Sequence, residues 1–348
     1  MMTHFLFIFV GSFLLTGLIR RIALWRHALA MPHFKHGPLL PVPRGGGYAL
    51  FLAMLFVFLM LYRYRLIDIA ATRALCFSGL ILVIGNLVHD LFPLSVKVRL
   101  GIQVLSAIAV LTWYGRDLVV LFWENYLYFS GFWLPIIVFG IMAFVNIFNF
   151  MDGVDGFAGS QAFIMMFASS VLLAFSDEMQ WSVPLILMCA PVLGFLAWNW
   201  PPAKIFMGDA GSSFMGVFIA TLGLLLATDT SVNLWCWLIM MGWFIVDSGW
   251  SLVVRIMHGN DWHRSHRMHA YQILARRWEN HFYVTLTLWL VNWLWLFPLA
   301  YLAMNNERWG VPLIAIAYTP LCFACWRLKA GESVDNDPGE PVYSDYQK

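Results

Sequence analysis

The chain has 348 residues, of which 61% are apolar, 17% are aromatic and only 11% are charged, and its formal net charge is +2. Water-soluble domains contain about 25% charged residues and disordered chains contain few aromatic ones, so this composition excludes both classes and indicates a protein whose solvent is the lipid bilayer. The net charge is near neutral and no basic run or face is present, so we expect no nucleic-acid partner.

About eleven apolar stretches approach the roughly 20 residues that a helix needs to cross a bilayer. In chain order they lie near residues 4–24, 47–62, 68–88, 98–114, 132–148, 157–174, 182–200, 212–228, 232–254, 282–304 and 309–327. The first stretch lacks a basic start and a small-residue cleavage site, so we expect a retained helix and not a signal peptide. The expected fold class is therefore all-α, a polytopic membrane protein with about eleven transmembrane helices.

Most of the 21 Lys and Arg residues follow the odd-numbered stretches. Because short cytoplasmic loops carry the excess of positive residues, this distribution predicts an N-terminus outside and a C-terminus in the cytoplasm. We expect residues 1–329 to form a single transmembrane catalytic domain. The acidic segment 330–348, which contains Pro and Gly, is expected to be a disordered tail.

Polar residues gather in five connections on the predicted inner side: 33–47, 89–99, 146–159, 201–213 and 258–272. Ionisable residues beside a membrane mark functional sites by default. These clusters lie at helix ends on one side, whereas transporters hold their substrates near the midplane on broken helices. The distribution favours an enzyme with a partly lipid substrate. A transporter for a polar or anionic solute is the alternative, suggested by Asp247 within an apolar stretch.

Four polar residues recur at every third position of one connection: Asn146, Asn149, Asp152 and Asp155. The glycines after the two acids predict a turn between two helices. Oxygen-bearing side chains at this spacing suit a hard cation or the hydroxyls of a sugar and a base. An EF-hand is excluded because its twelfth position, counted from Asp152, is Phe163 and not Glu. A purely structural turn with helix caps is the alternative.

The segment FMGDAGSS at 206–213 combines glycines, an acid and serines. Gly208 and Gly211 permit close backbone approach, and Ser212 or Ser213 can cap a helix whose N-terminus favours an anion. If an anion binds at that N-terminus, the neighbouring Asp209 predicts a divalent cation between the anion and its carboxylate. The segment is not a P-loop, because GK[ST] is absent, and an ordinary capping turn is the alternative.

The connection 258–272 places three histidines three residues apart with two arginines between them: His263, Arg264, His266, Arg267 and His269. Three histidines can bind zinc, but two interleaved guanidinium groups repel a cation, whereas Arg and His together suit phosphate. The pattern favours anion binding. Zinc binding and a basic loop at the membrane surface are the alternatives.

Three features stand together in one chain: NxxNxxDGxDGxA at 146–158, FMGDAGS at 206–212 and the His-rich loop that ends in HRMHAYQ at 266–272. They resemble the polyprenyl-phosphate N-acetylhexosamine-1-phosphate transferases, of glycosyltransferase family 4 type, and the last run resembles their O-antigen-initiating branch. The resemblance covers nearly the whole chain. The CDP-alcohol phosphotransferases are excluded, because the Ala-Arg of their DGxxAR signature is absent.

The resemblance implies transfer of N-acetylhexosamine-1-phosphate from a UDP-sugar to undecaprenyl phosphate, with release of UMP. This reaction would be the first membrane step in the synthesis of O-antigen or another cell-surface polysaccharide. It further implies Mg²⁺, with Mn²⁺ as a substitute, and a bacterial inner membrane protein with its active site on the cytoplasmic side. The resemblance is compatible with a homodimer, and it does not identify the N-acetylated sugar that is transferred.

The resemblance also implies residue roles. Asp209 matches the metal-binding Asp, Phe206 matches the aromatic that stacks on uracil, and Lys97 matches a lysine that holds phosphate. We expect catalytic roles for Asp90, Asp152, Asp155, His266 and His269, substrate binding by Lys97, Asn146, Asn149, Phe206, Arg264 and Arg267, and metal binding by Asp209.

The chain departs from the family at one position, because His89-Asp90 stands where the family usually has Asp-Asp. The first of those acids is the proposed general base of the family. A phosphate monoester with a second pKa of about 6 is already ionised at neutral pH, so it can attack without a base. We therefore expect direct in-line attack by the lipid phosphate, with Asp90 aiding the position of the metal or of that phosphate.

Overall fold

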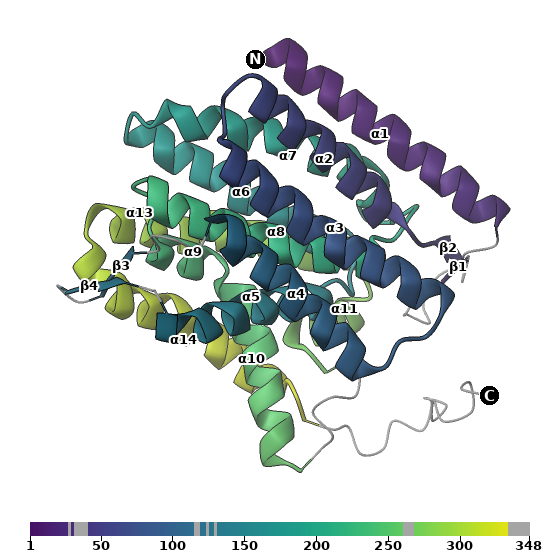
Figure 1. The fold of residues 1–348 in the computed structure, drawn as a ribbon. Helices are drawn as coiled ribbons and strands as arrows, with labels where there is room; N and C mark the ends of the chain where they lie inside the picture. The colour runs from purple at the N-terminus through teal and green to yellow at the C-terminus, as the bar shows by residue number, and fades with distance from the viewer. Residues whose placement is uncertain are drawn as a thin grey trace.

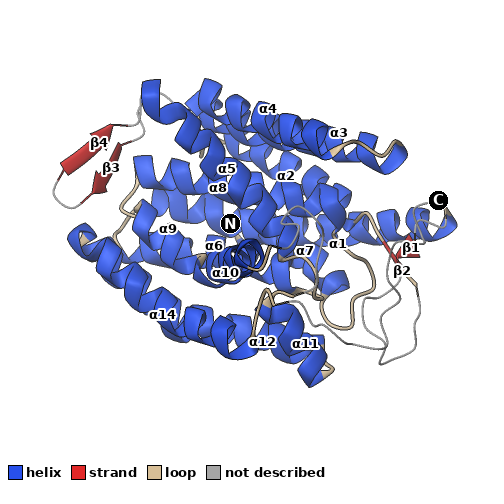
Figure 2. Ribbon diagram, turned by 90° about the horizontal axis from the view of Figure 1, so that it is seen from below, coloured by secondary structure: helices blue, strands red, loops and turns tan. Residues whose placement is uncertain are grey.

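The computed structural model describes residues 1–26, 29–30, 41–114, 119–122, 125–128, 131–259 and 268–332. These residues form a bundle of helices with two short antiparallel hairpins, β1–β2 and β3–β4, at opposite ends of the bundle (Figures 1 and 2). The all-α polytopic fold expected from the sequence is confirmed. Residues 333–348, most of the expected tail, lie outside the described residues, and the single-domain assignment stays a prediction.

The longer helices are α1 (Met2–Trp25), α2 (Gly46–Arg63), α3 (Ile69–Leu91), α4 (Val96–Tyr114), α5 (Leu134–Phe150), α6 (Phe157–Phe175), α7 (Met179–Asn199), α8 (Gly208–Asp229), α10 (Gly242–Met257), α12 (His281–Val291) and α14 (Gly310–Leu328). The shorter ones are α9 (Leu234–Met240), α11 (Ala270–Trp278), α13 (Phe297–Asn305), the 3-10 turns η1 (Gly131–Trp133) and η3 (Glu307–Trp309), and the π-helical turn η2 (Asn292–Leu296). The strands are β1 (Leu29–Ala30), β2 (Val42–Pro43), β3 (Val119–Phe122) and β4 (Asn125–Tyr128).

Within the described part of the chain, nine helical segments are long and apolar enough to cross a membrane. The bent pair α9 and α10 adds a tenth if it counts as one span, and α5 is a shorter apolar helix. Each apolar stretch expected from the sequence contains helix. The protein is thus a multi-pass membrane protein, and the orientation of its termini stays a prediction.

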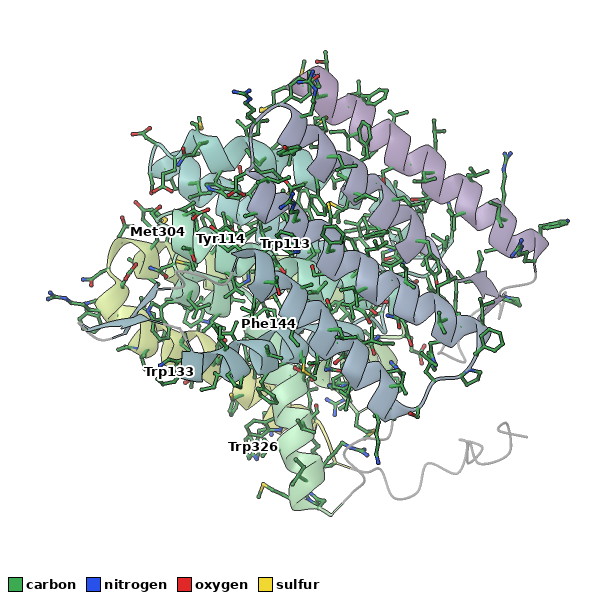
Figure 3. All side chains as sticks on the ribbon, viewed as in Figure 1. Trp113, Tyr114, Trp133, Phe144, Met304 and Trp326 are labelled. Carbon is green, nitrogen blue, oxygen red and sulfur yellow. The ribbon has the colours of Figure 1, made fainter. Side chains whose placement is uncertain are left out.

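The centre of the bundle is formed by α6, α7 and α8, which are largely buried, while α1 and α14 lie at the outside. A helix that is apolar on every side is expected inside a bundle or in contact with lipid, and both cases occur here. Figure 3 shows Trp133 and Trp326 at the outer surface, where both side chains are exposed. Exposed aromatic side chains therefore lie at the outer surface of the bundle.

The stretch 232–254, expected as one span, is divided into α9 and α10, which meet at an angle of 68°. The buried side chain of Gln161 donates a hydrogen bond of 2.9 Å to the carbonyl of Met240, the last residue of α9, and accepts one of 3.1 Å from Asn292. A carbonyl freed by a helix break inside a membrane has no water to bind. Gln161 supplies the missing partner, so the bend is stabilised by a residue of another helix.

We expect Gln161→Leu to destabilise the protein by about 1–3 kcal/mol, because it leaves the Met240 carbonyl and the Asn292 amide without this partner. Thermal unfolding in detergent measures the effect. Ser169→Ala is the matched control on the same helix, since the buried Ser169 hydroxyl has no hydrogen-bond partner among the described residues and its loss should leave stability unchanged. Equal stability of both variants would contradict the role of Gln161.

Candidate active site

The start of α2 is joined to the loop before α8 by backbone hydrogen bonds. The amide of Gly46 donates to the carbonyl of Phe206 at 3.0 Å, and the amide of Gly47 donates to the carbonyl of Met207 at 2.9 Å. Gly47 also packs directly on Gly211, and a Cβ at either glycine would overlap the other residue's backbone. Gly211 thus serves close helix packing and fixes the position at which α8 begins, whereas Gly208 permits the left-handed φ of 76° at the start of α8.

Residues 151–156 form the turn between α5 and α6, as the Asp-Gly pairs predict. Gly156 has a left-handed φ of 70°, and its amide donates to the Asn199 side chain at 3.1 Å. The carboxylate of Asp155 accepts from the amide of Ala203 at 3.0 Å and lies 3.1 Å from Nδ1 of His281. Asp155 therefore connects this turn to the α7–α8 loop and to α12. His281 was not singled out in the sequence.

Acidic side chains from two loops meet beside α8. Asp209 lies in the first turn of α8, where it is exposed, and its carboxylate is 3.7 Å from the guanidinium of Arg99 on α4. Burial, together with the charges of Asp209 and Asp155, raises the pKa of Asp152 well above its usual range. The charges of Asp209 and Asp155 thus disfavour the charged form of Asp152, which places the three acids in one group.

Asn149 faces the same place, because its side chain donates to the Ser212 hydroxyl in α8 at 3.0 Å. Asn146, one turn earlier, is directed elsewhere: it exchanges hydrogen bonds of 2.9 and 3.3 Å with Gln103 on α4. The three-residue spacing therefore does not give all four polar residues one role. Asn146 braces α5 against α4.

Asp90 lies at the end of α3 and accepts a hydrogen bond of 2.7 Å from the hydroxyl of Tyr48. Tyr48 also interacts electrostatically with Asp209. His89, by contrast, accepts the amide of Leu94 at 2.9 Å through Nδ1, so its ring closes the turn that leads to α4. Tyr48 was missed in the sequence, and its only signal there is its place directly after the run Gly45–Gly47.

Lys97 and Phe206 lie in the connections that border the acidic residues of the site. Lys97 is an exposed residue in the first turn of α4, two residues before Arg99. The backbone of Phe206 pairs with Arg44 in a parallel bridge, and its side chain is half-buried. The α3–α4 connection and the α7–α8 loop therefore border the same group of acids.

Of the His-rich connection, His263, Arg264, His266 and Arg267 lie outside the described residues. His269 is described: it is buried, and its ring stacks on Phe150 with the centroids 6.1 Å apart. The structure thus places His269 against the end of α5.

Asp247 of α10 holds the start of α11. Its carboxylate accepts from the amides of Ala270 at 2.7 Å and Tyr271 at 2.9 Å, and it lies 3.5 Å from Nδ1 of His269. A carboxylate at a helix N-terminus satisfies amides that have no partner within the helix and complements the helix dipole. The buried acid that suggested a transporter is therefore the cap of α11. Tyr271 in turn donates to the carbonyl of Phe150 at 2.8 Å.

The acids fit a magnesium ion whose coordination is completed by oxygen atoms of the substrate. Mg²⁺ takes oxygen ligands, keeps several waters, and commonly binds one or two protein carboxylates together with phosphate oxygens. Asp209 and Asp152 offer two carboxylates, and a cation between them would offset the charge of Asp209 that disfavours the ionised form of Asp152. Across the described ranges, no three His, Cys, Asp or Glu side chains form a closed metal cage. Two of the three histidines of the zinc alternative, His263 and His266, lie outside those ranges.

Residues 72–227 match the family described as glycosyl transferase family 4. The chain is 30% identical over 246 residues to an undecaprenyl-phosphate alpha-N-acetylglucosaminyl 1-phosphate transferase of Yersinia pestis, an alignment that covers 67% of this chain and 64% of the relative. It is 27% identical over 288 residues to a probable undecaprenyl-phosphate N-acetylglucosaminyl 1-phosphate transferase of Bacillus subtilis, which covers 81% and 79% of the two chains.

A third similarity is shorter. A phospho-N-acetylmuramoyl-pentapeptide-transferase of Caldanaerobacter subterraneus is 34% identical over 137 residues, or 38% of this chain and 43% of the relative. The chain therefore spans less than two thirds of the Yersinia and Caldanaerobacter relatives. The matched range 72–227 contains Asp90, Asp152, Asp155 and Asp209, whereas Tyr48 and the His-rich connection lie outside it.

We expect Asp152→Asn to raise the melting temperature of the substrate-free protein by about 2–4 °C at mildly alkaline pH. A carboxyl with a raised pKa destabilises the folded state once it ionises, so this contribution grows as pH rises and is absent at acidic pH, where Asp152 is protonated. Melting curves over a pH series measure the gain.

The control is Asp177→Asn, at an exposed acid remote from the site, for which any change should be independent of pH. If the gain of Asp152→Asn were the same at every pH, the ionisation of Asp152 would not be its cause.

Proposed function

We propose that this chain, whose residues 72–227 match glycosyl transferase family 4, acts as its transferase relatives do: it transfers N-acetylhexosamine-1-phosphate from a UDP-sugar to undecaprenyl phosphate, with release of UMP. The observation that supports the proposal is the grouping of Asp152, Asp155 and Asp209, in which the charges of Asp209 and Asp155 disfavour the charged form of Asp152. A diphosphate with its metal is the type of ligand that such a group stabilises.

In the proposed complex, Phe206 stacks on the uracil ring, and Asn149 and Asp155 line the nucleotide. Asp209 and Asp152 would hold Mg²⁺, and the ion would neutralise charge on the diphosphate. His266, Arg264 and Arg267 bind the diphosphate from the His-rich connection, and His269 lies beside Asp247 at the start of α11. Members of this family generally depend on a divalent metal.

The transfer step is an in-line displacement at the β-phosphorus of the UDP-sugar. An oxygen of the lipid phosphate forms the new bond to that phosphorus, the bond to the bridging oxygen breaks, and UMP leaves with the electron pair. Lys97 holds the attacking phosphate, which is a dianion at neutral pH. Because it needs no base, His89 is free to close the α3–α4 turn, while Tyr48 keeps Asp90 oriented.

The site lies at the helix ends that carry most of the Lys and Arg, which supports a cytoplasmic active site in the inner membrane of a bacterium. The HRMHAYQ run supports a role in initiating O-antigen or a related polysaccharide. The transporter alternative loses the observation that suggested it, because Asp247 caps α11.

The direct experiment is an assay of UMP release by purified protein with undecaprenyl phosphate, Mg²⁺ and a panel of UDP-N-acetylhexosamines. We expect Asp209→Asn to lower the rate at least about a thousandfold while the protein still inserts and folds, because it removes a proposed metal ligand. Glu279→Gln is the control, since Glu279 is an exposed acid beside α11 and outside the proposed machinery.

Substantial activity of Asp209→Asn would refute the metal assignment. A wild-type protein that releases no UMP with any sugar of the panel, but takes up a polar solute in vesicles, would support the transporter instead.

A further inference from the structure

Arg99 forms an ion pair with Asp209 that neither the sequence motifs nor the proposed mechanism uses. Its guanidinium nitrogen lies 3.7 Å from the Asp209 carboxylate, and the two side chains are 35% and 50% exposed. Ion pairs between groups this exposed are weak and exchange readily with solvent and other ions. Arg99 is therefore a counter-ion that Asp209 can give up.

A divalent cation competes with Arg99 for Asp209. A cation between Asp209 and Asp152 would stand close to the Arg99 guanidinium, and like charges at such distances repel each other. The released guanidinium then lies beside the metal site and can bind another anion. A substrate phosphate is such an anion.

The surroundings of Arg99 indicate which substrate. Arg99 borders a small pocket between α3, α4 and α8, which Asn86, Gln103 and Ser213 line together with the apolar Leu82 and Ile102. The exposed apolar residues of the adjoining helix ends include Leu91, Phe92, Val96 and Val98. An arginine at the border of this pocket and beside an apolar exposed edge is placed to meet an anion that is attached to a lipid. Guanidinium groups bind phosphate oxygens in pairs, which suits a terminal phosphate monoester.

We propose that Arg99 is an anion-binding residue that exchanges partners: it pairs with Asp209 in the substrate-free protein and binds the phosphate of the polyprenyl phosphate once a divalent cation occupies Asp209. The identity of the acceptor rests on the proposed function, whereas the exchange itself rests on the ion pair. The metal and the lipid phosphate then each raise the affinity for the other, because both bind more tightly when Arg99 is not paired with Asp209.

The first test measures Mn²⁺ binding to purified, substrate-free protein by electron paramagnetic resonance. We expect Arg99→Gln to bind Mn²⁺ about three- to fivefold more tightly than the wild type, because the competing cation is gone. Arg99→Lys keeps the charge and should stay near the wild-type affinity. Arg277→Gln, which removes an exposed cation of α11, should have no effect. Weaker or unchanged Mn²⁺ binding by Arg99→Gln would overturn the exchange.

The second test is the KM for each substrate at saturating Mg²⁺. Arg99→Gln should raise the KM for polyprenyl phosphate about tenfold or more, leave the KM for the UDP-sugar within about twofold, and be partly rescued in Arg99→Lys. A rise confined to the UDP-sugar, or an equal fall of kcat with both KM values unchanged, would contradict a lipid-phosphate ligand.

The Mn²⁺ experiment needs no turnover, so it judges the exchange even where the activity assay fails. If the wild type releases no UMP, the proposed function is wrong, and the second test becomes the effect of polyprenyl phosphate on Mn²⁺ affinity. In that test the lipid should tighten Mn²⁺ binding in the wild type and not in Arg99→Gln. Equal tightening in both proteins would overturn the proposal.

Discussion

Gly47 on α2 and Gly211 on α8 lie so close that neither position has room for a Cβ. Two backbone hydrogen bonds next to this contact join α2 to the loop that precedes α8. Because α8 begins at this contact, Asp209 in its first turn has a fixed place. Tyr48, the residue after Gly47, reaches Asp90 from the same contact. One close approach of two helices therefore positions acids that belong to separate connections.

One of the acids held in this way has an unfavourable charge. Burial and two neighbouring carboxylates disfavour the charged form of Asp152, while Arg99 pairs with Asp209 from the side of α4. A group of this kind is stabilised by a divalent cation and by the phosphates that complete its coordination. The unfavourable charge of Asp152 and the proposed chemistry thus have the same physical origin.

The helices themselves could be predicted from the sequence, because the bilayer requires long apolar stretches and leaves few other structures. The same constraint sorts polar residues to the helix ends, so five clusters on one side predicted a shared site. The break within 232–254 could not be predicted, since the group that stabilises it is Gln161 of α6, a helix remote in sequence. A single buried Gln in an apolar stretch gives no sign of which carbonyl it binds.

Within the site, the acids and amides of the two Asp-bearing motifs were identified from residue type and spacing, and the structure brings Asn149 and both loops together. Tyr48 and Arg99 were not identified from the sequence, because an aromatic or a basic residue at a membrane helix end looks like an ordinary interfacial residue. Asp247 was ambiguous for a different reason. Its partners are backbone amides of α11, and backbone atoms leave no mark in a sequence.

We propose that Asp209 and Asp152 act as one cation site. The most direct measurement is a Mn²⁺ titration of purified wild type, both single Asn variants and the double Asn variant. We predict that each single variant loses most of the bound Mn²⁺ and that the double variant loses little more, since two ligands of one ion are not independent. Wild-type affinity in Asp152→Asn, or losses that simply add in the double variant, would contradict a shared ion.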